Sequence, residues 1–157
     1  MKKILAFVLL AVMCFCVVAC NSDKYTQIGT SDFAIILPEG YKSCEDDFDE
    51  DQIAYYFKDT ESIDFDVYQW DKEGTYTLSE EAEYFAAEYN TVPEEIEING
   101  INGMKYVSVE SFDDEEYTVV NYMFEDEKSI VELCFWTIDT KEEYDAVDEI
   151  INTIKKN

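Results

Sequence analysis

The stretch SIVELCFWTI, residues 129–138, decides the fold, because apolar residues occupy both of its alternating faces. A strand that is apolar on both sides has to be covered on both sides, so we expect it in the centre of a sheet. The stretch YTVVNYMF, residues 117–124, precedes it across the short acidic turn Glu125-Asp126-Glu127 and predicts a hairpin partner. Residues 104–112 predict a further strand, closed by an acidic turn at 113–116. Strands joined by such short turns form an antiparallel meander.

The meander extends in both directions from this centre. Residues 33–37 predict a strand that ends at Pro38-Glu39-Gly40, and residues 53–58 and 63–70 predict a hairpin. Residues 95–99 predict one more strand. The dipeptides Asn99-Gly100 and Asn102-Gly103 are both typical of tight turns, since Asn and Gly tolerate positive φ.

Two amphipathic helices complete the pattern. The first is expected to start at Ser79 as N-cap and to end at Asn90 and Pro93, with an apolar face made of Ala82, Phe85, Ala86 and Tyr89. The second is expected to start with a capping box of Thr140 and Glu143, and Lys155 and Lys156 suit its C-terminal dipole. Its expected buried stripe is Tyr144, Val147, Ile151 and Ile154, with Ile150 beside it. The order strands, helix, strands, helix predicts an α+β domain, an antiparallel sheet with two helices packed on it.

The N-terminal segment has the composition of an export signal. Lys2 and Lys3 are followed by residues 4–19, which are uncharged and apolar or Cys. Sixteen residues span only about 24 Å as a helix, which is short of a hydrocarbon core of about 30 Å. The run ends in Val17-Val18-Ala19-Cys20, which resembles the lipobox of bacterial lipoproteins. An uncleaved membrane anchor is the alternative.

That resemblance implies a lipid anchor on Cys20. In lipoproteins the cysteine sulfur takes a diacylglycerol, the signal is cut before the cysteine, and the new amine is often acylated, for example with palmitate. We therefore expect a signal peptide at 1–19, a lipid-anchored tether at 20–24 and a single domain at 25–157, held on the extracytoplasmic face of a bacterial cell membrane. Several acyl chains hold a protein on a membrane far more firmly than one chain.

Composition excludes several kinds of site. Cleavage before Cys20 removes 19 of the 157 residues and leaves 138, with 9 Lys against 37 acids and a formal charge of −28. Such a surface repels nucleic acid, so no nucleic-acid partner is expected. The sequence contains neither His nor Arg. Histidine-based triads and arginine clamps on phosphate are therefore excluded, and we expect no cofactor and no enzymatic activity.

Several residues remain as candidates for specific roles. Asp47, Asp49 and Asp51 have the spacing that opens a calcium loop, but Gln52 and Lys58 stand where that loop needs Gly and Glu. They are therefore weak candidates for a surface cation site, with a solvated loop as the alternative. Trp70, at a strand end, is the aromatic residue singled out for ligand contact.

The cysteines and a set of acids leave further alternatives open. Cys44 and Cys134 either form a disulfide or stay free, with Cys134 as a buried apolar residue. Asp64, Asp66 and Glu132 are candidates for carboxylates that face one another across neighbouring strands, as acid–base chemistry would need.

The layout as a whole resembles the fold of the photosystem accessory protein PsbP and of the Ran-binding Mog family. The resemblance lies in Phe33-Ala34-Ile35-Ile36-Leu37-Pro38-Glu39-Gly40-Tyr41, the central helix, the Asn99-Gly100 turn, the meander and the final helix. It implies a non-enzymatic binding or accessory module for a protein or peptide partner in the cell envelope. A divalent-cation-binding or cation-sensing surface domain is the alternative.

Overall fold

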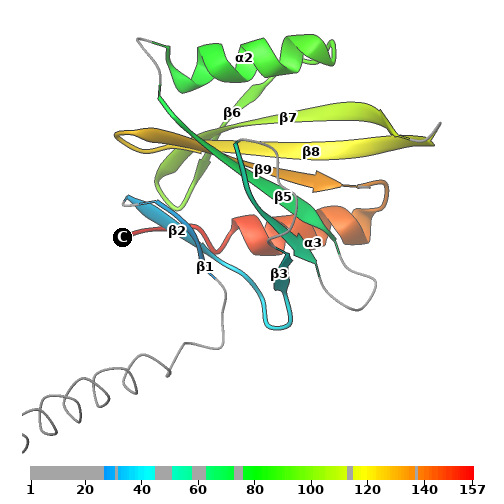
Figure 1. Ribbon diagram of the computed structural model, residues 1–157, viewed down its shortest axis with the longest axis horizontal. Coiled ribbons are helices and arrows are strands. Elements are labelled where there is room, and N and C mark those ends of the chain that lie inside the picture. The colour runs from blue at the N-terminus through cyan, green and yellow to red at the C-terminus, as the bar shows by residue number, and fades with distance from the viewer. Residues whose placement is uncertain are drawn as a thin grey trace, which may run out of the picture.

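The protein is built in three layers, with a large sheet between a helix on one side and a helix plus a small sheet on the other (Figure 1). The computed structural model describes residues 27–30, 32–44, 51–57, 63–72, 76–112, 115–136 and 138–157. The predicted signal peptide, lipobox and tether lie outside these ranges. Within them, no helix is both long and apolar enough to cross a membrane.

The large sheet has seven strands, and every neighbouring pair in it is antiparallel. β9 is the fourth strand of the seven, so the prediction of a central position for residues 129–138 is confirmed. β5 and β9 are neighbours although about sixty residues separate them, which closes the meander onto the first hairpin. Across the sheet the strands are β3 (Lys42–Cys44), β4 (Gln52–Phe57), β5 (Phe65–Asp71), β9 (Ser129–Trp136), β8 (Glu115–Glu125), β7 (Ile101–Phe112) and β6 (Glu94–Ile98).

Of the two turns predicted at Asn-Gly pairs, one is present in the structure and the other is not. Asn99 and Gly100 have φ of 53° and 76° and join β6 to β7, as predicted. Asn102 and Gly103 do not form a turn but lie inside β7. Gly103 is needed there because an added Cβ would lie 2.7 Å from the Phe124 ring and 2.8 Å from the Met123 carbonyl oxygen.

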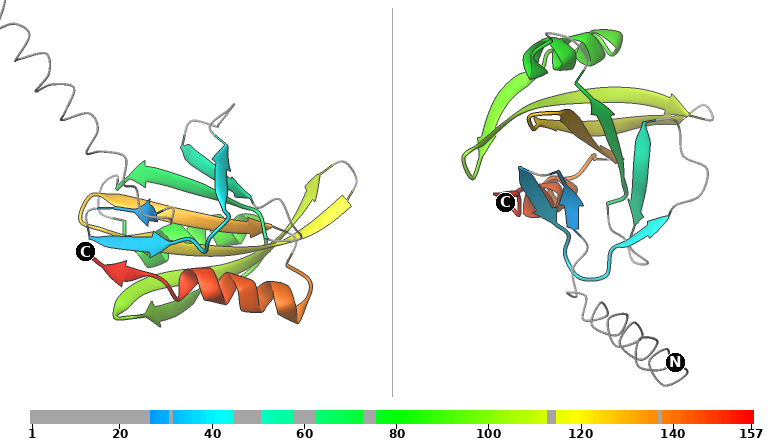
Figure 2. Two further views of the ribbon diagram at one scale, coloured as in Figure 1. Left: turned by 90° about the horizontal axis from the view of Figure 1, so that it is seen from below. Right: turned by 60° about the vertical axis from the view of Figure 1, so that its left-hand side comes forward.

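A second sheet of three short strands was not predicted. It consists of β1 (Gln27–Gly29), β2 (Phe33–Ile36) and β10 (Lys155–Lys156), with β2 in the middle. The prediction that Lys155 and Lys156 end the last helix is wrong, because they pair with Ala34 and Phe33 instead. The last residues of the chain therefore pair with β2, near the start of the domain (Figure 2).

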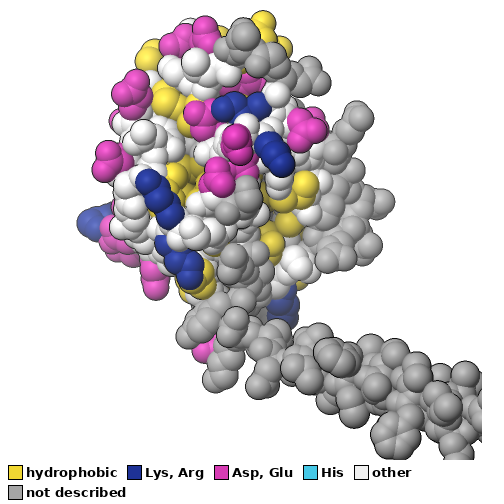
Figure 3. Space-filling view, turned by 90° about the vertical axis from the view of Figure 1, so that its left-hand side faces the viewer, with side chains coloured by type: hydrophobic (Ala, Val, Ile, Leu, Met, Phe, Trp, Pro, Cys, Tyr) yellow, Lys and Arg dark blue, Asp and Glu magenta, His cyan; other side chains and the backbone are white. Residues whose placement is uncertain are grey.

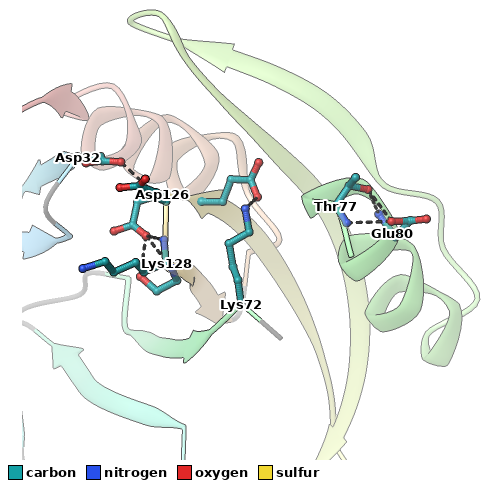
Figure 4. Close-up of polar contacts among 9 residues, drawn as sticks. Asp32, Lys72, Thr77, Glu80, Asp126 and Lys128 are labelled. Atoms are coloured by element: carbon teal, nitrogen blue, oxygen red, sulfur yellow. Dashed lines mark hydrogen bonds and ion pairs between the residues drawn. The ribbon is translucent and has the colours of Figure 1, made fainter. Parts of the chain in front are cut away.

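The helices begin at capping boxes. α2 (Leu78–Glu88) has Thr77 as its N-cap, with the Glu80 side chain accepting from the Thr77 backbone, so the prediction of Ser79 is wrong by two residues (Figure 4). α3 (Lys141–Ile151) starts at the predicted capping box of Thr140 and Glu143.

The main core lies on the α3 side of the large sheet. Val147, Ile150, Ile151 and Ile154 are buried there as predicted, whereas Tyr144 is 37% exposed. They pack with Phe33, Ile35 and Leu37 of the β2 region and with the inward-facing side chains of the central strands, such as Phe65 and Phe135. Predominantly antiparallel strands with two packed helices give the predicted α+β fold.

Candidate functional site

Helix α2 covers only part of the other face of the large sheet. It packs on β7 and β8, where Leu78, Ala82 and Ala86 contact Met104 and Met123 in a small second core. The β5–β9 half of the same face lies beside the helix rather than under it (Figure 2, right). This offset leaves a groove of about 780 Å³ between α2 and strands β5 and β9. A volume of this size is typical of ligand sites in proteins.

The groove is walled mainly by aromatic rings. Trp70, the residue predicted for ligand contact, lines it and lies 5.6 Å from Phe85 of α2, measured between ring centres. Both tryptophans of the sequence line the groove, since Trp136 joins it from β9. The aromatic residues are Tyr68, Trp70, Tyr76, Phe85, Tyr89, Tyr106 and Trp136.

The groove is also strongly acidic. Its carboxylates are Asp51, Asp71, Glu81, Glu88, Glu110 and Glu132, against Lys72 as the lysine that lines it. Lys72 is already engaged, because its Nζ lies 2.6 Å from Glu125 Oε2 (Figure 4). On the end of the molecule seen in Figure 3, lysine side chains likewise lie among acidic ones. The groove therefore presents an uncompensated negative charge to an occupant.

Glu132 is the most deeply buried acid of the groove, with 5% of its surface exposed. The Tyr106 hydroxyl donates to its Oε1 at 2.6 Å. Burial raises the pKa of Glu132 to about 7, and nearby Glu110 adds to the rise, while the Tyr106 hydrogen bond opposes it. Burial also raises the pKa of the Tyr106 hydroxyl far above its ordinary value, and the Glu132 carboxylate adds to that rise.

Two further acids act at the groove: Glu110 lines it, and Asp66 holds Trp136, which lines it. Asp66 accepts from Gln52 Nε2 at 2.6 Å and from the Trp136 indole Nε1 at 2.6 Å, which fixes the position of the Trp136 ring. Glu110 accepts from the Ser108 hydroxyl at 3.3 Å and forms a hydrogen bond with Tyr89. Burial raises the pKa of Glu110, and both hydrogen bonds lower it.

The predicted set of facing carboxylates is brought together in part. Asp66 and Glu132 share one face of the neighbouring strands β5 and β9, because Asp66 pairs with Cys134 and Tyr68 pairs with Glu132. Asp64 lies just before β5 and accepts from the Tyr55 hydroxyl at 2.8 Å.

Cys134 is a free, buried thiol that lines the groove. Burial raises the pKa of this thiol well above its ordinary value, and the nearby carboxylates add to the rise. The alternative of a disulfide with Cys44 does not hold. Cys44 pairs with Tyr55, Tyr55 with Asp66, and Asp66 with Cys134. Three strand spacings, about 14 Å, therefore separate the two backbones, beyond the reach of a disulfide.

The predicted cation site is only partly within the described residues. Asp51 lines the rim of the groove, and Asp47 and Asp49 lie outside the described ranges. In the described part of the chain, no three His, Cys, Asp or Glu side chains are placed to hold a metal ion together.

Solved structures match this architecture, whereas no family model and no curated protein matches the sequence. The solution structure of cyanobacterial PsbP (CyanoP) from Synechocystis sp. PCC 6803 aligns with a TM-score of 0.60 over 88% of this chain and 95% of that protein, at 8% identity. The fold is PsbP-like.

Two other solved structures share this PsbP-like fold. LpqN of Mycobacterium tuberculosis, described as involved in cell envelope biogenesis, gives a TM-score of 0.55 at 10% identity, over 85% of this chain and 90% of LpqN. A Bacteroides thetaiotaomicron protein gives 0.58 at 12% identity over 86% of this chain, which spans about half, 49%, of that protein. At such identities the likeness shows the fold alone.

Proposed function

We propose that the protein is a non-enzymatic, membrane-anchored module that binds a protein or peptide partner on the extracytoplasmic side of a bacterial membrane. The groove beside α2 carries this proposal. It combines rigid aromatic rings, which are common anchors of protein interfaces, with a floor set on strands of the sheet.

The anchor is proposed from the sequence. Val17-Val18-Ala19-Cys20 resembles a lipobox, and a lipid on Cys20 would hold the domain on the membrane surface. An envelope role fits LpqN, which is described as involved in cell envelope biogenesis and shares the PsbP-like fold. The lack of His and Arg in the sequence favours binding over acid–base or phosphoryl-transfer chemistry.

Site-specific photo-crosslinking tests whether a partner occupies the groove. The full-length protein, expressed in the cells of its source, would carry p-benzoylphenylalanine in place of Tyr76, which lines the groove and is 66% exposed. Tyr84 provides the matched control, because it is 65% exposed on α2 but does not line the groove.

We expect irradiation of the membranes to give a discrete adduct with the probe at position 76 and none with the probe at position 84. Mass spectrometry of the adduct identifies the partner segment. No adduct at position 76, or equal adducts at both positions, would reject the groove as the binding site.

A further inference from the structure

We propose that the deep end of the groove binds a lysine-type primary ammonium group, with the Glu132 carboxylate as its counter-ion. This inference rests on the proposed function and adds the chemical class of the group that anchors the partner.

The first argument is that only one carboxylate oxygen of Glu132 accepts a hydrogen bond from the described residues. Its Oε1 accepts the 2.6 Å hydrogen bond from Tyr106, and its Oε2 accepts no hydrogen bond from the described residues. None of the ion pairs among those residues includes Glu132. Because Glu132 lines the groove, Oε2 is the atom that an occupant can reach. A buried carboxylate without a cation is costly, and an incoming cation removes that cost.

The second argument is the charge of the groups that surround Glu132 on the strands and the helix packed near it. β7 contributes Tyr106 and Glu110, and β5 contributes Asp66 and Tyr68. α2 contributes Glu81 and Glu88 to the wall, and Tyr89 follows directly after the helix. β9 itself contributes Cys134, whose pKa is raised. These groups are acidic or neutral. Lys72, at the rim, is paired with Glu125. The described residues offer Glu132 no cation, so we infer that its counter-ion comes from the occupant.

The third argument concerns the shape of that cation. The aromatic walls suit an aliphatic stem that ends in a charge, because ring faces attract cations and pack against methylene groups. A guanidinium binds best to two free oxygens of one carboxylate, and Tyr106 already occupies one oxygen of Glu132. A quaternary ammonium has no N–H to donate to Oε2. A divalent metal needs more oxygen ligands than the described residues bring together. A primary ammonium meets all of these constraints.

The raised pKa of Glu132 makes this binding dependent on pH. With a pKa of about 7, Glu132 is mostly protonated at pH 6 and mostly ionised at pH 8. A lysine side chain stays charged throughout this range. If only the ionised form holds the ammonium, the dissociation constant rises about tenfold between pH 8 and pH 6.

Calorimetric titration of the full-length protein in nonionic detergent tests the proposal. The probes are acetyl-Gly-Lys-Gly-amide and the same peptide with norleucine, which keeps the aliphatic stem and lacks the ammonium. Trp70 and Trp136, the only tryptophans of the sequence, both line the groove, so a change in tryptophan emission places the peptide there. The variants are Glu132→Gln and, as a matched control, Glu83→Gln on α2, which is exposed and does not line the groove.

We expect the lysine peptide to bind at least ten times more tightly than the norleucine peptide at pH 8. We also expect this preference to disappear in Glu132→Gln and to persist in Glu83→Gln. Equal binding of the two peptides, an unchanged preference in Glu132→Gln, or no binding of the lysine peptide at millimolar concentration overturns the inference. If the adduct at position 76 forms while these results are negative, only the ammonium assignment fails. If neither is seen, the groove itself is not a binding site.

Discussion

Replacing Glu132 with Gln removes a buried charge and keeps an oxygen that can accept from Tyr106. The carboxyl group titrates near 4.5 when exposed and near 7 in the folded protein. Between these values the folded state binds more protons than the unfolded state, so this group stabilises the fold below pH 4.5 and loses that effect as the pH rises to 7. At about 1.36 kcal/mol per pKa unit, the rise amounts to roughly 3 kcal/mol.

We therefore expect Glu132→Gln to be more stable than the wild type by up to about 3 kcal/mol above pH 7, with the difference vanishing near pH 4.5. Urea denaturation at pH 4.5, 6 and 8 measures this difference. Glu97→Gln, at an exposed position of β6, is the control for removing one negative charge from an acidic surface. A Glu132→Gln protein that is less stable than the wild type at pH 8, or a difference that does not change with pH, would refute the reasoning.

Three further predictions concern the anchor and the frame of the groove. Cys20→Ser should release the protein from membranes or leave it unprocessed, as fractionation and mass measurement would show; a processed variant that stays on the membrane contradicts the lipid anchor. Thr77→Ala should lower the free energy of unfolding, measured in urea, by about 1 kcal/mol, because it removes the capping box of α2. Thr77→Ser, which keeps the hydroxyl, should retain most of the wild-type stability. Equal losses in the two variants would argue against capping. Gly103→Ala should lower the free energy of unfolding by about 1–3 kcal/mol, because the added Cβ would clash with the Phe124 ring and the Met123 carbonyl. An unchanged free energy of unfolding in the same assay would contradict this close approach.

Local patterns in the sequence were sufficient for the central sheet and the second helix. Two apolar faces placed β9 in the centre, and Thr140 with Glu143 marked the start of α3. The predicted start of α2 at Ser79 is wrong, although Ser is a favoured N-cap residue and Glu80 and Glu81 suit a first turn. Thr77 has Glu80 three residues later, which completes a capping box, whereas Ser79 has Ala82 at that position. β1 and β10 are too short to show any periodicity, and both form only by pairing with β2. For β10, this partner lies far away in the sequence.

The groove depends on features that no local pattern contains. Trp70 could be singled out because an aromatic residue at a strand end favours contact with a ligand. The sequence prediction includes Glu132 only as a member of a carboxylate set, although a lone acid inside the apolar run Ile130–Trp136 itself indicates a buried charge. Its environment follows from the offset of α2 over β7 and β8 and from the pairing of β5 with β9. Both are tertiary arrangements between segments far apart in the chain.

The most direct test of a groove that binds a cation on Glu132 is the number of protons released when the lysine peptide binds. Calorimetry at pH 6 and at pH 8, each in two buffers of different ionisation enthalpy, gives this number. With a pKa of about 7, the wild type should release about 0.9 proton per peptide at pH 6 and about 0.1 at pH 8, and Glu132→Gln should release essentially none. No proton release by the wild type at pH 6, or the same release by Glu132→Gln, would contradict the account.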